Sequence, residues 1–384
     1  MEKNKCETLY RNEIMKIDYF FDENHNNQNL AYIFTPSMNR NLEGNAYGGE
    51  VFIRNGYDTI AFKISNDDWF QSIPVELFQL IVSINQKKGY VKRVSYGSSM
   101  GGYAAIALSK FLDCNISIVF SPQYSIDEEF DTRWMTYAKK INFKYRISKE
   151  SVNEDCKFFI FYDNKDMDEL QVRKLTNILP VDGTKLIKLP YAGHPAIHCL
   201  AEIGLIKSLL VNIVNEVGLE GMDFLSYKKT TKSYFQTLSI NLLKKKHLKW
   251  ALSAIESALK IDSKVAGFHS LKSGILDRMG KVNEAVISIK EAITLDPNNP
   301  HFFGNLSNLL LHKDLFEEAL FAIESALKID FKVAGFHRHK SGILDRMGKV
   351  NEAVISIKEA IALDPNNVHH LNHLRHLLNK QANI

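Results

Sequence analysis

Cysteine is scarce in this chain of 384 residues, which has four cysteines and no Cys-x-x-Cys pair. Such spacing provides neither a disulfide framework nor a set of zinc ligands, so we expect reduced thiols and no metal site. No apolar run approaches the roughly 18 residues of a membrane-spanning helix. The first eight residues also lack the apolar core of an export signal. We therefore expect a cytoplasmic protein without a membrane span.

A strong excess of one charge is also lacking, because the formal net charge is +4. The positive excess lies in residues 220–384, which hold 23 Lys and Arg against 17 Asp and Glu. No glycine-rich loop of the phosphate-binding type is present. We expect no nucleic-acid partner and no bound cofactor.

Short apolar segments alternate with helical patterns between residues 16 and 217. This alternation favours a mainly parallel sheet with helices on both faces. The first segment, Lys16–Phe21, is predicted as an edge strand. The other predicted strands are 29–34, 59–64, 91–96, 116–120, 157–162 and 185–189, and the predicted helices are 75–86, 103–112, 168–179 and 196–217.

The most informative segment is Gly97-Ser98-Ser99-Met100-Gly101, which lies between a predicted strand and a predicted helix. The Gly-x-Ser-x-Gly spacing is typical of a nucleophile elbow, in which glycines permit a tight turn around the serine. Ser99 would project beside the helix N-terminus, whose free N–H groups favour the negative charge that develops in acyl transfer. The sequence therefore predicts Ser99 as a nucleophile.

A serine nucleophile needs a base, and the base needs a carboxylate that orients it. In this strand–turn–helix context the chain order is Ser, then Asp or Glu, then His. His194 follows the last predicted strand and is the expected base, with His198 as the fallback. For the acid we expect Asp166, with Asp163 and Asp168 as alternatives in the same loop.

The negative oxygen of an acyl-transfer intermediate needs N–H donors. We expect the backbone N–H of Met100 as one donor and that of Ser37 as the other. Met38 N–H and the hydroxyl of Thr35 are alternatives, whereas Pro36 has no N–H to donate.

Residues 121–156 are longer than a simple crossover requires, and we expect either a lid or an ordinary crossover helix there. The segment carries an arginine and four aromatic residues of interest, Arg133, Trp134, Tyr137, Phe143 and Tyr145.

Residues Gly97–Gly102, Asp166 and His194 resemble motifs of the α/β-hydrolase superfamily, and the resemblance covers residues 15–217. The Gly-Ser-Ser-x-Gly-Gly elbow and the Gly-His loop are similar to those of bacterial capsule and surface-polysaccharide O-acetyltransferases and their esterase relatives. The resemblance implies an α/β-hydrolase fold and an acetyl-Ser99 intermediate that is resolved by a sugar hydroxyl instead of water. The triad itself does not distinguish the two acceptors, because both use the same intermediate. Acetyl-CoA is then a candidate acyl donor.

From about residue 232 a period of 34 residues replaces this pattern, with alanine at 251, 285, 319 and 353. Residues 251–299 and 319–367 are identical at all but five of 49 positions, so a two-repeat block has been duplicated. The period and the small residues resemble tetratricopeptide repeats, although Ser273, Ser307 and Ser341 stand where glycine or alanine is usual. The predicted repeats are 232–265, 266–299, 300–333 and 334–367.

We thus expect a hydrolase-like domain at 1–219, a linker at 220–231, an all-α solenoid at 232–367, and a capping helix and tail at 368–384. Because each part should have its own core, residues 1–219 are expected to fold without the repeats.

Polar residues on the first helix of each repeat are expected to line a concave groove. Arginine forks and asparagine amides suit carboxylates, so the expected ligand is an anionic polysaccharide or an acidic partner protein. The alternatives are a solvated polar face and a homo-oligomer contact. The candidate binding residues are Arg278, Asn305, Asn308, Arg338 and Arg346.

Two functions follow from these features. The leading hypothesis is a serine O-acetyltransferase or carboxylesterase whose repeats bind an acceptor or partner. The rival is a scaffold protein with an inactive hydrolase-like domain.

Overall fold

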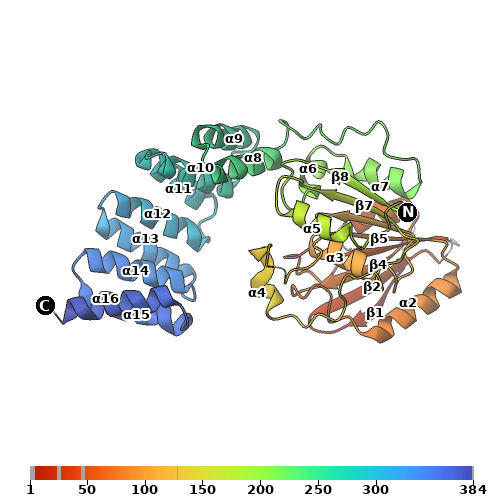
Figure 1. Ribbon diagram of the computed structural model, residues 1–384, viewed down its shortest axis with the longest axis horizontal. Helices are drawn as coiled ribbons and strands as arrows, with labels where there is room; N and C mark the ends of the chain where they lie inside the picture. The colour runs from red at the N-terminus through yellow and green to blue at the C-terminus, as the bar shows by residue number, and fades with distance from the viewer. Residues whose placement is uncertain (1–4, 24–26, 45–47, 128, 383–384) are drawn as a thin grey trace. The chain divides into compact units, whose positions relative to one another are not determined.

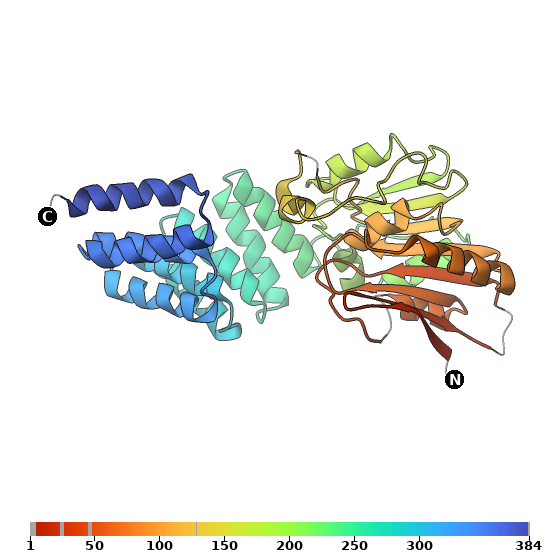
Figure 2. The same cartoon turned by 90° about the horizontal axis from the view of Figure 1, so that it is seen from below.

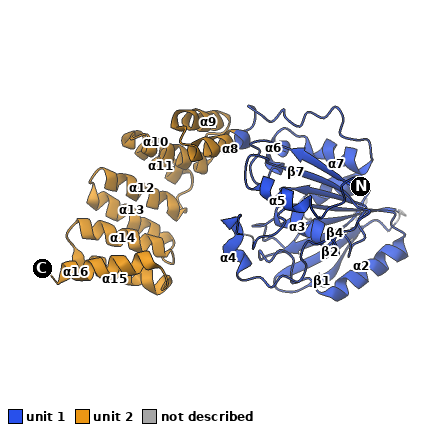
Figure 3. Cartoon of the chain, viewed as in Figure 1, with its two compact units in different colours: residues 1–234 blue, residues 235–384 orange. Residues whose placement is uncertain are grey.

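The computed structural model describes residues 5–23, 27–44, 48–127 and 129–382. The chain divides into two compact units, Met1–Tyr234 and Phe235–Ile384, coloured separately in Figure 3. Residues 220–231, predicted as a linker, belong to the first unit, and Tyr227 among them is fully buried.

Within the described residues, the first unit contains one eight-stranded sheet in the order β1-β2-β4-β3-β5-β6-β7-β8 (Figure 1). Strands β3 to β8 are parallel to one another, and β2 runs antiparallel to both of its neighbours. The strands are β1 (Lys5–Arg11), β2 (Met15–Phe21), β3 (Asn29–Phe34), β4 (Asp58–Ile64), β5 (Lys92–Ser98), β6 (Ile116–Phe120), β7 (Lys157–Tyr162) and β8 (Thr184–Lys188).

The prediction that residues 16–21 form an edge strand is wrong. Strand β1 pairs with the outer side of β2, with Lys5 opposite Phe21. The side chains of β1 are mostly polar and exposed, so this strand lacks the apolar run on which the prediction relied.

Helices cover both faces of the sheet. Ser95 Oγ donates to the Ala105 carbonyl of α3 (Met100–Ala107), whereas the next residue, Tyr96, contacts Phe52 of α1 (Gly49–Arg54). Successive strand side chains point to opposite faces, so α3 and α1 lie on opposite sides. The other helices of this unit are α2 (Val75–Lys88), α5 (Asp168–Leu175), α6 (Ile197–Glu202), α7 (Ile206–Val214) and the short η1 (Thr132–Trp134) and α4 (Met135–Ala138). The single helix predicted at 196–217 is two helices, separated at Gly204 with φ +70°.

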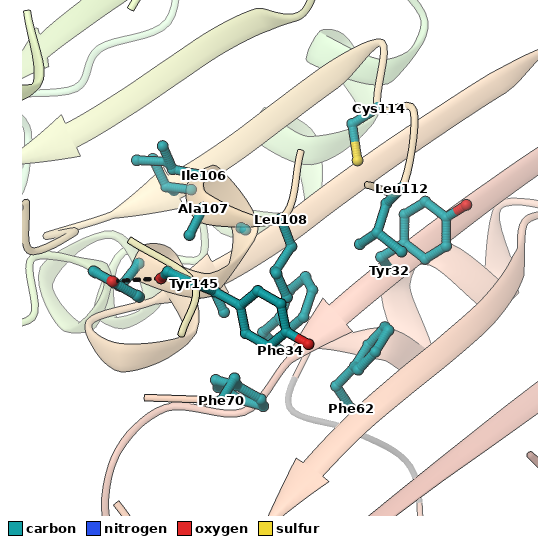
Figure 4. Packing of buried hydrophobic residues seen from close by; sticks show 14 of the residues in the cluster. Tyr32, Phe34, Phe62, Phe70, Ile106, Ala107, Leu108, Leu112, Cys114 and Tyr145 are labelled. Atoms are coloured by element: carbon teal, nitrogen blue, oxygen red, sulfur yellow. Dashed lines mark hydrogen bonds between the residues drawn. The ribbon is translucent and has the colours of Figure 1, made fainter. Parts of the chain in front are cut away.

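The core on the α3 side of the sheet is aromatic (Figure 4). The Phe34 ring centroid lies 4.6 Å from that of Phe62 and 5.3 Å from that of Phe70. Complete burial of each such ring contributes about 2 to 3 kcal/mol to folding. This core fixes the end of β3, next to the elbow after β5.

The second unit is a stack of antiparallel helix pairs (Figure 2). Each repeat has a buried serine on its first helix that donates to an alanine carbonyl on its second, as Ser307 does to Ala319 at 2.7 Å and Ser341 to Ala353 at 2.7 Å. These bonds explain the serines where small apolar residues are usual. The helices are α8 (Lys232–Lys244), α9 (Leu248–Ile261), α10 (Ala266–Arg278), α11 (Val282–Leu295), α12 (Pro300–His312), α13 (Phe316–Ile329), α14 (Ala334–Arg346), α15 (Val350–Leu363) and α16 (Val368–Gln381). Among the described residues, none of the helices is long and apolar enough to span a membrane.

Candidate active site

Ser99 occupies the sharp turn between β5 and α3, with φ 53° and ψ −118°. A non-glycine residue adopts such a conformation only where its surroundings impose it. A Cβ on Gly97 would lie 2.2 Å from the Gly101 carbonyl oxygen, and a Cβ on Gly101 would lie 2.5 Å from that of Phe34. The two glycines are therefore required by close backbone contacts, and they hold Ser99 in the elbow.

Three side chains form a continuous hydrogen-bonded chain at this turn. Ser99 Oγ lies 2.8 Å from His194 Nε2, and His194 Nδ1 lies 2.9 Å from Asp168 Oδ1. A carboxylate can only accept, so Nδ1 carries the proton and Nε2 is free to accept from the serine hydroxyl. This is the arrangement in which a histidine can remove a proton from serine.

The carboxylate that contacts His194 is Asp168, not the expected Asp166. Asp168 is the first residue of α5 and is buried, so its side chain points into the protein beside the imidazole. The sequence predicted the start of this helix at residue 168, but it did not show which of the three aspartates faces His194.

Asp163 has a structural contact of its own. Its carboxylate accepts hydrogen bonds from the backbone N–H groups of Lys165, Tyr191 and Gly193, at 2.8 to 2.9 Å. Burial raises the pKa of Asp163, and these N–H donors oppose that rise. Asp163 thereby joins the loop that carries the acid to the loop that carries His194.

The charge on Asp168 is stabilised from two sides. Burial opposes its ionisation, but His194 and Arg133 outweigh burial and hold the pKa of Asp168 below its ordinary value. Arg133 Nη1 and Nη2 each lie 3.1 Å from Asp168 Oδ1. The sequence placed Arg133 in the segment expected to be a lid or a crossover helix, but it gave no sign of this contact.

Gln123 is a site residue that sequence reasoning missed. Its Nε2 donates to Ser99 Oγ at 3.0 Å, and its Oε1 accepts from Trp69 Nε1 at 3.4 Å. Gln123 follows β6 by three residues and thus lies at the same sheet edge as the elbow, which is the signal that could have identified it. The bond directs the serine proton toward His194, because the Ser99 oxygen already accepts from the amide.

A hollow of about 490 Å³ opens beside Ser99 and His194. Arg133, Trp134 and Tyr137 of the expected lid segment line it, whereas Tyr145 is buried against Phe78. The segment contains η1 and α4 and no long crossover helix within its described residues. The other residues that line the hollow are Pro36, Ser37, Met38, Ser98, Pro195, Ile197 and His198.

The candidate oxyanion donors differ in their availability. Met38 N–H donates to Asp67 Oδ1 at 3.1 Å, and the Thr35 hydroxyl donates to the Phe62 carbonyl at 3.4 Å. Among the described residues, the backbone N–H of Ser37 makes no hydrogen bond, and that of Met100 opens α3 without a helical partner. Ser37 and Met100 thus remain the two candidate donors.

His198, the fallback base, lines the hollow but makes no contact with Ser99. Burial lowers the pKa of His198. The geometry therefore assigns the contact with the serine to His194.

In the second unit, the candidate binding residues do not form one cluster. Asn305 and Asn308 line a hollow of about 140 Å³ together with Asp277. Arg346 is paired with Asp314 at 2.7 Å and lies over the Phe316 ring. The remaining two candidates, Arg278 and Arg338, are exposed and do not line that hollow.

Residues 266–299 and 339–367 match the family model of the tetratricopeptide repeat. This match confirms the prediction of such repeats. Tetratricopeptide arrays in general present extended concave surfaces on which other molecules bind. No curated protein matches the chain.

Several solved structures resemble part of the chain. MamA from Desulfovibrio magneticus RS-1 is 16% identical with a TM-score of 0.37, and the match covers 39% of this chain and 85% of MamA. PilF of Pseudomonas aeruginosa is 18% identical with a TM-score of 0.37, covering 40% of this chain and 69% of PilF. YrrB, described as a TPR protein with an unusual peptide-binding site, is 15% identical with a TM-score of 0.35, covering 46% of this chain and 86% of YrrB.

Proposed function

We propose that the first unit is a serine acyl-transfer enzyme of the α/β-hydrolase superfamily, either an O-acetyltransferase or a carboxylesterase. The observation that supports this most is the unbroken contact from Ser99 through His194 to Asp168. The strand–turn–helix context of the serine and the chain order Ser, Asp, His add to it.

In the proposed reaction, Ser99 attacks the carbonyl carbon of an ester or thioester while His194 Nε2 takes the serine proton. The N–H groups of Met100 and Ser37 would bind the resulting oxyanion. His194 then returns the proton to the leaving group, and an acyl-Ser99 ester remains. In the second half of the reaction, His194 removes a proton from the acceptor hydroxyl, whose oxygen attacks the acyl carbon. The bond from this carbon to Ser99 Oγ then breaks, and His194 donates the proton to Ser99 Oγ.

The acceptor distinguishes an esterase from a transferase. Trp134 and Tyr137 wall the hollow beside Ser99, and aromatic rings of this kind pack well on the apolar faces of sugars. They support a sugar hydroxyl as acceptor, in keeping with the resemblance to surface-polysaccharide O-acetyltransferases. Acetyl-CoA is the corresponding candidate donor.

For the second unit we propose an anionic ligand, either the acceptor polysaccharide or an acidic segment of a partner protein. Arg278 and Arg338 support this because both are exposed, whereas Arg346 already pairs with Asp314. The double variant R278E/R338E should bind an acidic polymer more weakly, and added salt should weaken binding in the unmodified protein. Arg346→Glu is the comparison variant, because the guanidinium that it removes is already paired. Binding of the acidic polymer by R278E/R338E as strong as by the unmodified protein would contradict the proposal.

The test of the enzyme proposal is labelling with a serine-directed fluorophosphonate. The unmodified protein should be labelled and S99A should not, with turnover of a small ester lowered by about 10³-fold or more because triad members act as a unit. Ser98→Ala is the matched control at the neighbouring serine. A folded chain that no fluorophosphonate labels would favour the scaffold with an inactive first unit. For a labelled chain, comparing acetyl-CoA with a simple ester, each with and without a sugar acceptor, separates transfer from hydrolysis.

A further inference from the structure

One guanidinium joins two buried carboxylates next to the Ser99–His194–Asp168 chain. Arg133 donates through both Nη atoms to Asp168 Oδ1, the same oxygen that lies 2.9 Å from His194 Nδ1. Through Nε and Nη2 it also donates to the two oxygens of Asp131, at 2.8 and 2.7 Å. Asp131 and Asp168 are 0% and 1% exposed, so the guanidinium donates the hydrogen bonds that water would give to these carboxylates at the surface.

We propose that Arg133 is a positioning residue, which holds the Asp168 carboxylate in the orientation that its hydrogen bond to His194 requires. The inference rests on the proposed function and adds a residue that acts through Asp168. Arg133, which also lines the hollow, would thus support the Asp168–His194 contact.

The orientation of the Arg133 guanidinium is set by Asp131, which is itself held by other hydrogen bonds. Asp131 is fixed by the backbone N–H of Arg133 at 3.2 Å and by Gln171 Nε2 at 2.9 Å. Gln171 is fixed in turn, because its Oε1 accepts from the backbone N–H of Tyr124 at 2.8 Å. A planar guanidinium gripped at two nitrogens by Asp131 cannot rotate, so its Nη atoms present a rigid pair of donors to Asp168. His194 Nδ1 lies 2.9 Å from Oδ1 and 3.1 Å from Oδ2 of Asp168, and without this pair of donors the carboxylate could turn so that neither oxygen keeps that distance.

The ionisation of Asp168 also depends on its contact with Arg133. The charged and titratable groups that face Asp168 are Arg133 and His194, with Asp131 behind the guanidinium, Asp163 in the same loop and His198 beside His194. Burial favours the protonated form of Asp168. Without Arg133, only His194 and the hydrogen bond with Ser121 would oppose this effect, so the pKa of Asp168 would rise. The low-pH limb of the rate profile would then move to higher pH, because protonated Asp168 cannot orient the imidazole.

The decisive variant is R133M/D131N. Removing Arg133 alone leaves two buried carboxylates and endangers the fold. The double variant instead removes one charge of each sign, and the amide oxygen introduced at position 131 can still accept from Gln171. D131N is the reference for it, and R133K retains the charge but not the planar fork. R146M is the matched control in the same segment, because Arg146 pairs with the exposed Asp127 at 3.0 Å, away from the triad.

Labelling by a fluorophosphonate is measured against pH, with urea unfolding of every variant. We expect R133M/D131N to react about tenfold or more slowly than D131N, a loss of the size that follows removal of a hydrogen-bond partner from a metal ligand. Its low-pH limb should lie at higher pH, R133K should be intermediate, and R146M should match the unmodified protein. A double variant with the rate and pH profile of D131N would overturn the inference and leave the proposed function standing.

A second measurement does not need reactivity. The proton on His194 Nδ1, held by Asp168, should give a low-field proton resonance in the unmodified protein and in D131N, and this resonance should vanish in R133M/D131N. If the unmodified protein fails to react with the probe, the proposed function fails, and this resonance still decides the inference. Its persistence in the double variant would overturn the positioning role.

Discussion

Asp168 Oδ1 lies 2.9 Å from His194 Nδ1. Asp163, five residues earlier, makes no such contact and instead binds the backbone N–H groups of Tyr191 and Gly193. One carboxylate orients the imidazole and the other holds the loop that carries it. The two roles have different experimental signatures.

Asp168→Asn should lower turnover of a small ester by about 10⁴-fold, because an amide in place of the carboxylate no longer fixes the histidine tautomer. Asp166→Asn is the matched control two residues away and should change turnover far less. Initial rates under saturating substrate test both. If the two variants lose activity equally, the assignment of the acid to Asp168 is wrong.

Asp163→Ala should destabilise the first unit while leaving the chemistry of the folded fraction intact. The substitution leaves three backbone N–H groups without their acceptor, at a cost of about 2 kcal/mol or more. Urea unfolding measures the loss, and fluorophosphonate labelling in the absence of urea measures the remaining reactivity. Full stability of D163A would show that this carboxylate does not join the two loops.

A fragment of residues 1–234 should fold and react, whereas one of residues 1–219 should not. The shorter fragment lacks Tyr227, whose buried hydroxyl donates to the Pro190 carbonyl at 2.9 Å, and Thr231, which is buried beside Cys199. Loss of a buried aromatic side chain alone costs about 3 to 5 kcal/mol. Soluble expression and circular dichroism of the two fragments provide the comparison. A stable fragment 1–219 would restore the boundary expected from the sequence.

The repeat unit should lose stability as the pH falls through the range of histidine titration. Burial, aided by Arg338, lowers the pKa of His339 to about 4 from 6.5. Between these values the folded state binds fewer protons than the unfolded state, so stability falls as the pH decreases from 6.5 toward 4. In His339→Leu this dependence should weaken, and the equivalent position of the duplicated block already holds leucine, Leu271.

The measurement is the urea midpoint of residues 232–384 at pH 7 and at pH 5. His369→Gln is the control, because His369 is exposed. If H339L retains the full difference between the two midpoints, another group is responsible for it.

Features set by local spacing could be predicted from the sequence. The turn at Ser99 and the position of His194 after the last strand depend on neighbouring residues. The repeats depend on a period that recurs along 136 residues, from 232 to 367. The acid could not be chosen, because three aspartates lie within six residues, and both Asp163 and Asp168 are buried. Only the folded structure shows which one contacts His194. Strand β1 was not predicted, because most of its side chains are polar and form no apolar run. Gln123 and Arg133 reach the site through contacts with residues far away in the chain, which no local pattern encodes.

The duplicated block has a consequence for how this protein can change length. Repeat arrays contact only their nearest neighbours, and equivalent positions such as Ser239 and Ser307 make the same bond to an alanine carbonyl. An additional copy of the 68-residue block would therefore meet its neighbours with surfaces that already fit. Nearly identical tandem segments also favour unequal recombination of the coding DNA. We expect natural variants to differ by whole pairs of repeats, so that the span of ligand they can hold grows or shrinks in equal steps while the serine site stays unchanged.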